Sequence, residues 1–114
     1  MSELACMIEA DDKKICIYPS EKIVKLLGKE YTILIIVLLG NRKKARFNEI
    51  AKNLGNPSPN LLSYRLQEME EAGLVLRNIV ETKPITVEYS LTEKGWELRK
   101  LLIPIFEWIE KMQN

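Results

Sequence analysis

Apolar residues recur at helical spacing in the first half of the chain. Residues 20–27 form a short amphipathic segment in which Ser20 is a plausible N-cap and Gly28 follows the last apolar position. Residues 30–39, EYTILIIVLL, are apolar nearly all round. This pattern predicts a buried central helix, and the Gly-Asn pair at 40–41 is expected to end it.

Two further helical patterns follow, separated by a tight turn. Residues 47–54, FNEIAKNL, are amphipathic, and Gly-Asn-Pro at 55–57 breaks the pattern. Ser58 can cap the next helix, Pro59 suits its first position, and Gly73 supplies its end. The buried stripe of this helix is predicted from spacings of four and three residues, at Leu62, Leu66 and Met69.

The last third of the chain changes from strand to helix character. Residues 74–80 and 85–91 favour strands, and the ETKP loop at 81–84 between them predicts a β-hairpin. Thr92 then opens a last helix that Pro104 is expected to kink or divide. Its apolar positions are Trp96, Leu98, Leu101, Leu102, Ile105, Phe106, Trp108, Ile109 and Met112.

This order of elements is that of a winged helix-turn-helix: a mainly α fold with a small β-hairpin, of the α+β class. The chain is expected to form one domain with an N-terminal arm (1–17), the helix-turn-helix (47–72), the wing (74–91) and a C-terminal dimerisation helix (92–113). In such folds the second helix of the turn motif enters the major groove and the wing reaches the adjacent backbone or minor groove. The same topology also serves protein contacts, so it does not decide function alone.

Composition removes several classes of function. The 114 residues contain no histidine, which excludes zinc helices and histidine-dependent triads and dyads, and the chain has no glycine-rich phosphate loop. We therefore expect neither an enzyme nor a bound metal or cofactor.

The longest apolar run, at 31–39, is about half the length of a membrane-spanning helix, and the N-terminus lacks the layout of a signal peptide. A cytoplasmic protein without a membrane partner is predicted. Cys6 and Cys16 are too few for a disulfide framework and are expected to be reduced thiols.

Charge is distributed unevenly along the chain. Residues 41–67 contain six basic side chains and one acidic one, a net charge of +5, whereas the whole chain carries only +1. The basic residues of this region are Arg42, Lys43, Lys44, Arg46, Lys52 and Arg65. A compact basic region favours phosphate binding, because neutralised phosphates release condensed counterions. The alternative is a solvated basic loop.

Four ordered stretches resemble the HxlR-type transcriptional regulators. LLGKEYTILII (26–36) is similar to a family signature, RFNEIAKNL (46–54) to RFNELxRxL, SPNLLSYRLQEMEEAGLV (58–75) to SxRxLSxRLxELExAGLV, and VEYSLTEKG (87–95) to VEYxLTxxG. The similarity extends from about Tyr18 to Trp108. It implies a dimeric, sequence-specific DNA-binding regulator in which each protomer inserts one recognition helix (58–72) into the major groove of duplex DNA.

Helical geometry independently supports a reading face on residues 58–72. With Leu62 facing inward, Asn60, Tyr64 and Gln67 point away from the core, and Ser63 and Leu61 flank them. Amide side chains can pair with adenine edges, hydroxyls can contact bases or phosphates, and a leucine can touch a thymine methyl. An ordinary polar helix face is the alternative. The candidate DNA contacts of this helix are Ser58, Asn60, Leu61, Ser63, Tyr64, Arg65 and Gln67.

Within this helix Arg65 is nearer the core stripe, so it either clamps a phosphate or pairs with a neighbouring glutamate. Other candidate contacts lie outside the helix. Lys83 and Thr86 flank the tip of the wing, although a hairpin tip is polar by default. Arg42, Lys43, Lys44 and Arg46 are expected to set affinity and its salt dependence rather than specificity. Related regulators usually carry an arginine where Asn60 stands, so the operator is expected to differ.

The last helix has more apolar residues than one face can bury, which predicts a homodimer interface together with the N-terminal segment and first helix. The predicted interface residues are Trp96, Leu101, Ile105, Phe106, Trp108, Ile109 and Met112. A long helix packed along its own domain is the alternative.

The resemblance also raises a redox role. Some members of this family have a redox-sensing cysteine in a Cys-Pro pair before the first helix. Tyr18-Pro19 occupies that register here and Cys16 lies two residues earlier, so Cys16 is a candidate redox site and otherwise a plain thiol. A redox or small-molecule effector is therefore left open.

Two functions of different classes stand beside each other: a DNA-binding regulator, and a winged-helix module that binds proteins through its apolar last helix. The basic segment and the Asn/Tyr/Gln face favour DNA, because a protein-docking face would be expected to show more aromatic or aliphatic anchors.

Overall fold

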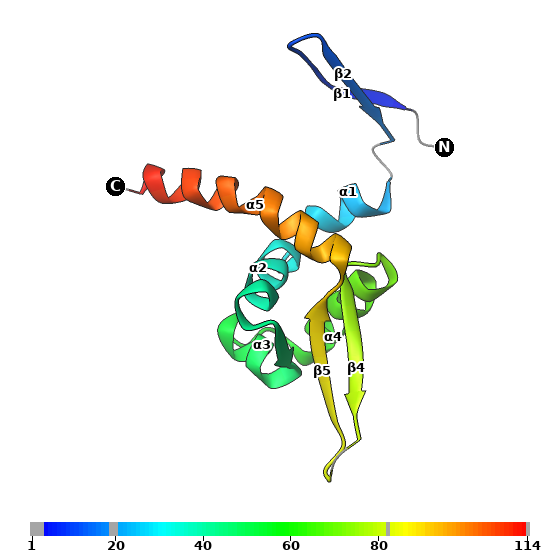
Figure 1. The fold of residues 1–114 in the computed structure, drawn as a ribbon, viewed down its shortest axis with the longest axis vertical. Coiled ribbons are helices and arrows are strands. Elements are labelled where there is room, and N and C mark those ends of the chain that lie inside the picture. The colour runs from blue at the N-terminus through cyan, green and yellow to red at the C-terminus, as the bar shows by residue number, and fades with distance from the viewer. Residues whose placement is uncertain (1–3, 19–20, 82, 114) are drawn as a thin grey trace.

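The computed structural model describes residues 4–18, 21–81 and 83–113. Five helices and five strands lie within these ranges, and Figure 1 labels most of them. Their bounds are β1 Ala5–Ala10, β2 Lys13–Ile17, α1 Lys22–Leu27, α2 Thr32–Arg42, β3 Lys44–Arg46, α3 Phe47–Asn53, α4 Pro59–Glu71, β4 Val75–Val80, β5 Thr86–Leu91 and α5 Glu93–Met112. The winged helix-turn-helix predicted from the sequence is confirmed.

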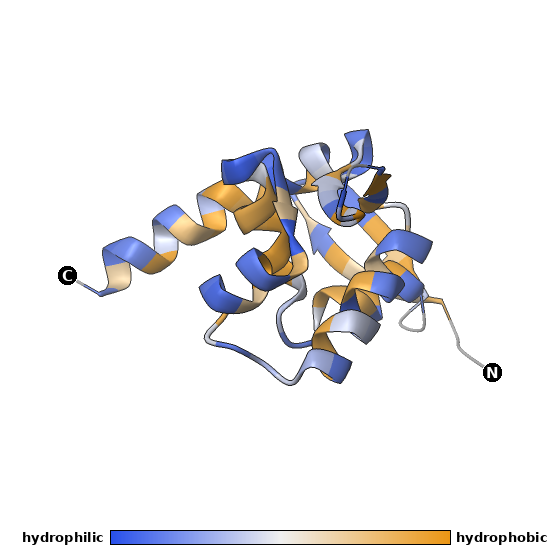
Figure 2. Cartoon of the chain, turned by 90° about the horizontal axis from the view of Figure 1, so that it is seen from below, coloured by the Kyte–Doolittle hydropathy of each residue, from blue (hydrophilic) through white to orange (hydrophobic). Residues whose placement is uncertain are grey.

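Helix α2 lies at the centre of the core. Ile35, Ile36 and Leu39 of α2 are fully buried, and they belong to one apolar cluster with Ile50 of α3. Helix α4 contributes the predicted stripe to the same cluster, with Leu62, Leu66 and Met69 all buried. Figure 2 shows apolar segments of the helices gathered toward the middle of the domain. The outer face of α4 is therefore free to carry polar side chains.

The wing belongs to a three-stranded sheet rather than to an isolated hairpin. Strands β4 and β5 pair antiparallel as expected, and β3 adds to the other edge of β5 to give the order β3-β5-β4. Strand β3 was not predicted because it is only three residues long and two of them are basic. Ala45, which pairs with Tyr89, is its one buried residue. This strand fixes the basic residues 44 and 46 against the base of the wing.

One predicted helix end was wrong. The central helix does not end at Gly40-Asn41 but continues to Arg42, which places Gly40 inside α2. Of the two outcomes predicted for Pro104, a kink or a division of the last helix, the division is not observed, since α5 is one helix of 20 residues with the proline inside it. The proline removes one backbone hydrogen bond from α5 without ending the helix.

Capping positions agree with the sequence in part. Ser58 occupies the N-cap of α4 and Pro59 its first turn, but the Ser58 side chain makes no capping hydrogen bond. Ser20 lies outside the described residues, and Glu21 is the N-cap of α1. At α5, Thr92 Oγ1 accepts a hydrogen bond from Gly95 N (3.0 Å) and donates one to Gly73 O (2.5 Å). The start of α5 is thereby fixed to the end of α4.

The N-terminal segment forms a hairpin that the sequence reading missed. Strands β1 and β2 pair antiparallel, and Asp11 and Asp12 between them both have positive φ values, 51° and 62°. Aspartate tolerates this left-handed conformation better than most residues, which suits a two-residue hairpin turn. Figure 1 shows the hairpin standing clear of the body, at the end of the long axis opposite the wing.

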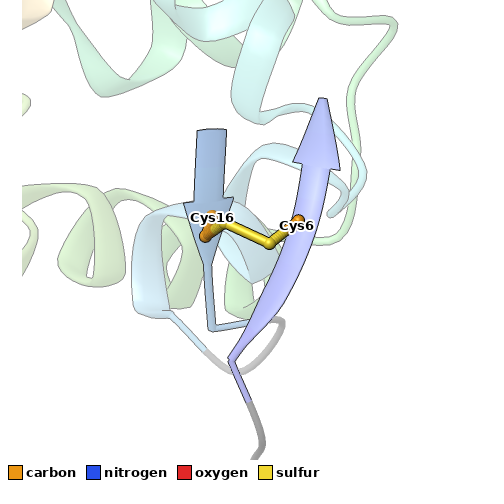
Figure 3. The surroundings of a disulfide bond; sticks show 2 residues. All are labelled: Cys6 and Cys16. Atoms are coloured by element: carbon orange, nitrogen blue, oxygen red, sulfur yellow. A yellow bond between two sulfur atoms is a disulfide. The ribbon is translucent and has the colours of Figure 1, made fainter. Parts of the chain in front are cut away.

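A disulfide joins Cys6 of β1 to Cys16 of β2, so the prediction of reduced thiols was wrong (Figure 3). The two residues are directly paired across the strands, ten positions apart in sequence. The pairing became visible only with the hairpin. The two-residue turn alone sets a register in which Ile8 pairs with Ile15, and a register shift between Cys6 and Ile8 then places Cys6 opposite Cys16.

Candidate nucleic-acid interface

The outward face of α4 carries the side chains that the sequence predicted for it. Asn60, Ser63, Tyr64 and Gln67 are exposed, and Tyr64 presents 58% of its surface to solvent. Gln67 Nε2 makes only a long hydrogen bond, 3.3 Å, to Glu71 Oε1. Ser58 just before the helix is exposed and Leu61 is half-buried. These side chains are available for an external partner, but their contacts with DNA stay a prediction.

Arg65 does not belong to this exposed face. Only 7% of its surface is exposed, its Nε donates to Glu30 O at 2.9 Å, and its Nη1 pairs with Glu68 Oε1. The glutamate pairing, one of the two roles predicted for Arg65, is the one observed. A guanidinium occupied in this way holds α4 against the residues before α2, so we do not retain Arg65 as a DNA contact.

Glu68 receives a second cation from the turn between α1 and α2. Lys29 Nζ lies 2.5 Å from Glu68 Oε2. Burial alone would raise the pKa of the Glu68 carboxyl, but the hydrogen bonds and charges of Lys29 and Arg65 together lower it. The ionised carboxylate therefore joins α4 to the preceding helices at neutral pH.

The basic segment, defined as residues 42–46, lies between the end of α2 and the start of α3. Arg42 is the last residue of α2, Lys43 follows with a left-handed φ of 66°, and Lys44 and Arg46 flank buried Ala45 in β3. All four basic side chains are exposed. Two of them form surface ion pairs, Arg42 with Glu49 at 3.2 Å and Lys44 with Glu88 at 3.9 Å. Such pairs are weak in water and can exchange for a phosphate.

The wing contributes differently from the prediction. Lys83 near the tip is exposed, as expected. The Thr86 hydroxyl is buried and has no hydrogen-bond partner within the part of the chain that the structure describes. Thr86 therefore does not present its hydroxyl to a phosphate in this conformation.

A residue missed by sequence reasoning lies beside the reading face. Arg77 of β4 lines a hollow of about 250 Å³ together with Ser63, Gln67, Glu70 and Tyr89. Its guanidinium adds a positive charge between α4 and the wing. The alternation of β4 could have suggested that an arginine at position 77 lies on one face of the wing, but not that this face adjoins α4.

Helix α5 leaves the body with apolar side chains exposed. Its C-terminal half extends beyond the other elements (Figure 1), and Leu101 and Trp108 expose 71% and 61% of their surfaces. The remaining predicted interface residues that are exposed are Trp96, Ile105, Ile109 and Met112. Phe106 is partly buried and packs against the core. Apart from Phe106, the apolar residues predicted for the interface in the C-terminal half of α5 are therefore not buried against their own domain.

The described ranges contain no group of three or more His, Cys, Asp or Glu side chains able to hold a metal ion. No helix within them is both long and apolar enough to span a bilayer.

Together these elements define the chain as a winged helix-turn-helix protein of the kind found in transcriptional regulators. Residues 26–114 match the family model described as HxlR-like helix-turn-helix. The chain belongs to this HxlR-like family, whose matched relatives are transcriptional regulators rather than enzymes.

Individual relatives agree with this assignment. The HTH-type transcriptional regulator YvaP of Bacillus subtilis is 42% identical over 88 residues, which cover 77% of this chain and 81% of YvaP. The crystal structure of "a possible HxlR family transcriptional factor" from Thermoplasma volcanium superimposes with a TM-score of 0.82 at 35% identity, covering 99% of this chain and 98% of the other. The oxidised form of the redox regulator HypR matches with a TM-score of 0.73 at 30% identity, covering 82% of this chain and 95% of HypR.

Proposed function

We propose that this protein is a sequence-specific DNA-binding transcriptional regulator that binds duplex DNA as a homodimer. In each protomer α4 lies in the major groove and the wing lies along the adjacent backbone or minor groove. The observation that carries the proposal is the exposed, uncharged hydrogen-bonding face of α4, with the basic segment and the wing cations Arg77 and Lys83 elsewhere on the same domain.

The two sets of side chains have different tasks. Asn60 and Gln67 can form bidentate pairs with adenine edges, and the hydroxyls of Ser63 and Tyr64 can contact a base or a phosphate. The basic segment neutralises phosphates and supplies affinity that depends on salt. Because the reading side chains are uncharged, specificity and salt dependence are separable by mutation.

The homodimer is supported by α5. Soluble monomers rarely leave several large apolar side chains exposed along one helix, and a two-fold axis would cover both copies of this surface at once. The β1–β2 hairpin and α1 are the elements that we expect to extend this interface. Met7, Ile8 and Ile15 of the hairpin are apolar and about half-exposed. Two recognition helices would then reach half-sites about one DNA turn apart.

Selection of bound sequences from a random duplex pool tests the proposal. The expected result is a two-fold symmetric site with half-sites about 10 base pairs apart, centre to centre. Tyr64→Ala and Asn60→Ala should relax the selected sequence while the fold is retained. Arg77→Ala is a useful comparison, because it should weaken binding to selected and unselected duplexes alike.

Failure of this test would have a definite meaning. If no sequence is enriched at low salt, or if binding is insensitive to salt, the protein is not a DNA-binding regulator, and the protein-binding winged-helix module becomes the favoured function. If both α4 variants select the wild-type sequence, α4 is not the reading helix.

A redox response is the second function that an observation favours. Cys16 is bonded to Cys6, and both residues are exposed on the hairpin. Reduction by a dithiol transfers two electrons and two protons, giving two thiols here and a cyclic disulfide in the reagent. DNA affinity should then differ between dithiothreitol-treated and diamide-treated protein, and Cys6→Ser with Cys16→Ser should remove the difference. Equal affinities in both states would assign the disulfide a structural role only.

A further inference from the structure

Gly40 occupies an unusual position, inside the helix at the centre of the core. A glycine in a helix lowers the helical equilibrium about fivefold relative to alanine. A Cβ built on Gly40 would lie 1.8 Å from Arg99 Nε and 1.9 Å from Arg99 Cδ. The missing side chain is therefore what lets the Arg99 side chain of α5 lie directly across α2.

Arg99 uses this position to bind the last turn of α2. Its Nε donates to Val37 O at 3.3 Å, and its Nη2 donates to Asn41 Oδ1 at 2.5 Å. Its guanidinium also lies 6.0 Å from the centroid of the Trp96 ring, within the range of a cation–π contact. We call these residues, Val37, Gly40, Asn41 and Arg99, the α2–α5 junction.

The junction explains why α2 continues beyond Gly40-Asn41. That pair is a helix-ending signal in the sequence, and Arg99 opposes it by bonding a carbonyl and a side chain of the same turn. The next residues are Arg42 and Lys43, where the basic segment begins. Arg99 thus links α5, the helix that carries the exposed apolar side chains, to the start of the basic segment.

We propose that Arg99 is a positioning residue for DNA binding, which fixes the basic segment relative to the dimer helix α5. The inference rests on the proposed function. In a dimer that forms through α5, the distance between the two basic segments is well defined only if each segment is held rigidly to its own α5. Without Arg99 the last turn of α2 would fray, and the basic segments would reach their phosphates from a wider range of positions.

The contact itself is tested by a double-mutant cycle in denaturant unfolding, which needs no DNA. Gly40→Ala alone should lower the folding equilibrium constant, because the new methyl displaces Arg99 from Val37 O and Asn41. In an Arg99→Ala background the same Gly40→Ala change should raise the constant, up to about fivefold, because alanine favours helix. The same effect of Gly40→Ala in both backgrounds would overturn the junction.

The positioning role is tested on the duplex selected by the wild type. Arg99→Lys keeps the positive charge but loses the planar guanidinium, so it replaces Arg99→Ala in this test if the alanine variant does not fold. Either variant should bind about two- to thirtyfold more weakly with an unchanged salt slope. Both should lose less affinity than the wild type when one or two base pairs are inserted between the half-sites. Lys100→Ala, at the exposed neighbouring position of α5, is the matched control and should behave as wild type.

Three results for the Arg99 variants would overturn the positioning role. A salt slope lowered by about one unit per protomer would make Arg99 a phosphate contact. A half-site spacing preference as strict as that of the wild type, or an unchanged affinity for the selected duplex, would show that Arg99 does not position the basic segment. A wild-type protein that selects no duplex would instead refute the proposed function, and the unfolding cycle would still show whether Arg99 binds α2 as described.

Discussion

Replacing Lys43 with alanine should remove one phosphate contact per protomer without altering the fold. Lys43 is exposed, and it takes part in no ion pair within the described ranges, so its removal leaves no partner charge behind. Its φ of 66° is retained in the variant, because alanine and lysine both carry a Cβ and meet the same backbone restriction. We therefore expect the free energy of unfolding to change by less than about 0.5 kcal/mol.

The size of the DNA effect follows from counterion release. Each neutralised phosphate contributes about 0.9 to the slope of log K against log salt, so a homodimer with Lys43→Ala in both protomers should lose about 1.8. Arg42→Ala is a less clean change, because it also leaves Glu49, its partner at 3.2 Å, unpaired near the DNA. Its loss of affinity at low salt should therefore exceed that of Lys43→Ala.

Fluorescence anisotropy on the selected duplex, over a series of salt concentrations, measures this slope. Lys94→Ala, an exposed lysine in the first turn of α5, is the control and should leave the slope unchanged. If Lys43→Ala keeps the wild-type slope, the basic segment does not meet the backbone and the charge argument from the sequence fails. If it lowers the stability instead, the loss of affinity would have to be assigned to folding.

Four further changes test the stability and assembly of the domain. Leu62→Ala, at a fully buried position of α4, should cost about 2–5 kcal/mol in denaturant unfolding; a loss below about 1 kcal/mol would contradict its place in the core. Thr92→Ala should cost about 0.5–2 kcal/mol, because it removes the α5 cap and the bond to Gly73, and Thr92→Ser should restore most of it. Because the folded pKa of Glu68 lies below its ordinary value of 4.5, its contribution is present above that pH and lost as the pH falls through the folded pKa; the stability gap between wild type and Glu68→Gln should therefore close in acid, and a gap independent of pH would refute the assignment. Trp108→Lys should shift sedimentation from dimer to monomer at micromolar concentration, and a wild type that already sediments as a 13.2 kDa monomer would refute the α5 interface.

The predictions from the sequence agree best with the structure for features that depend on a single helix or hairpin. The stripe of Leu62, Leu66 and Met69 placed both faces of α4, because residues four or three positions apart lie on the same side of a helix. The wing strands were found to within a residue, since their β-branched runs are bounded by Gly73 at one end and a Pro-containing loop at the other. Local periodicity is sufficient for such features.

The predictions that were wrong or left open concern residues whose partners lie on other elements of the fold. Gly40-Asn41 reads as a helix end, and it does not end α2 because Arg99, 58 residues after Asn41, binds that turn. Cys6 and Cys16 read as unrelated thiols until the hairpin placed them opposite each other. Arg65 read as either a phosphate contact or a glutamate partner, and its burial between Glu30 and Glu68 decided the matter.

The sequence by itself determined the class of fold, the HxlR-like family and the outward face of α4, because helical period, turn residues and family motifs are local properties of the chain. Only the tertiary structure decided which charges are free, which are paired, and where the basic segment stands relative to α5. Those properties depend on neighbours contributed by other elements, and a charged side chain acts on a partner only if packing leaves it exposed and its own ion pairs are weak.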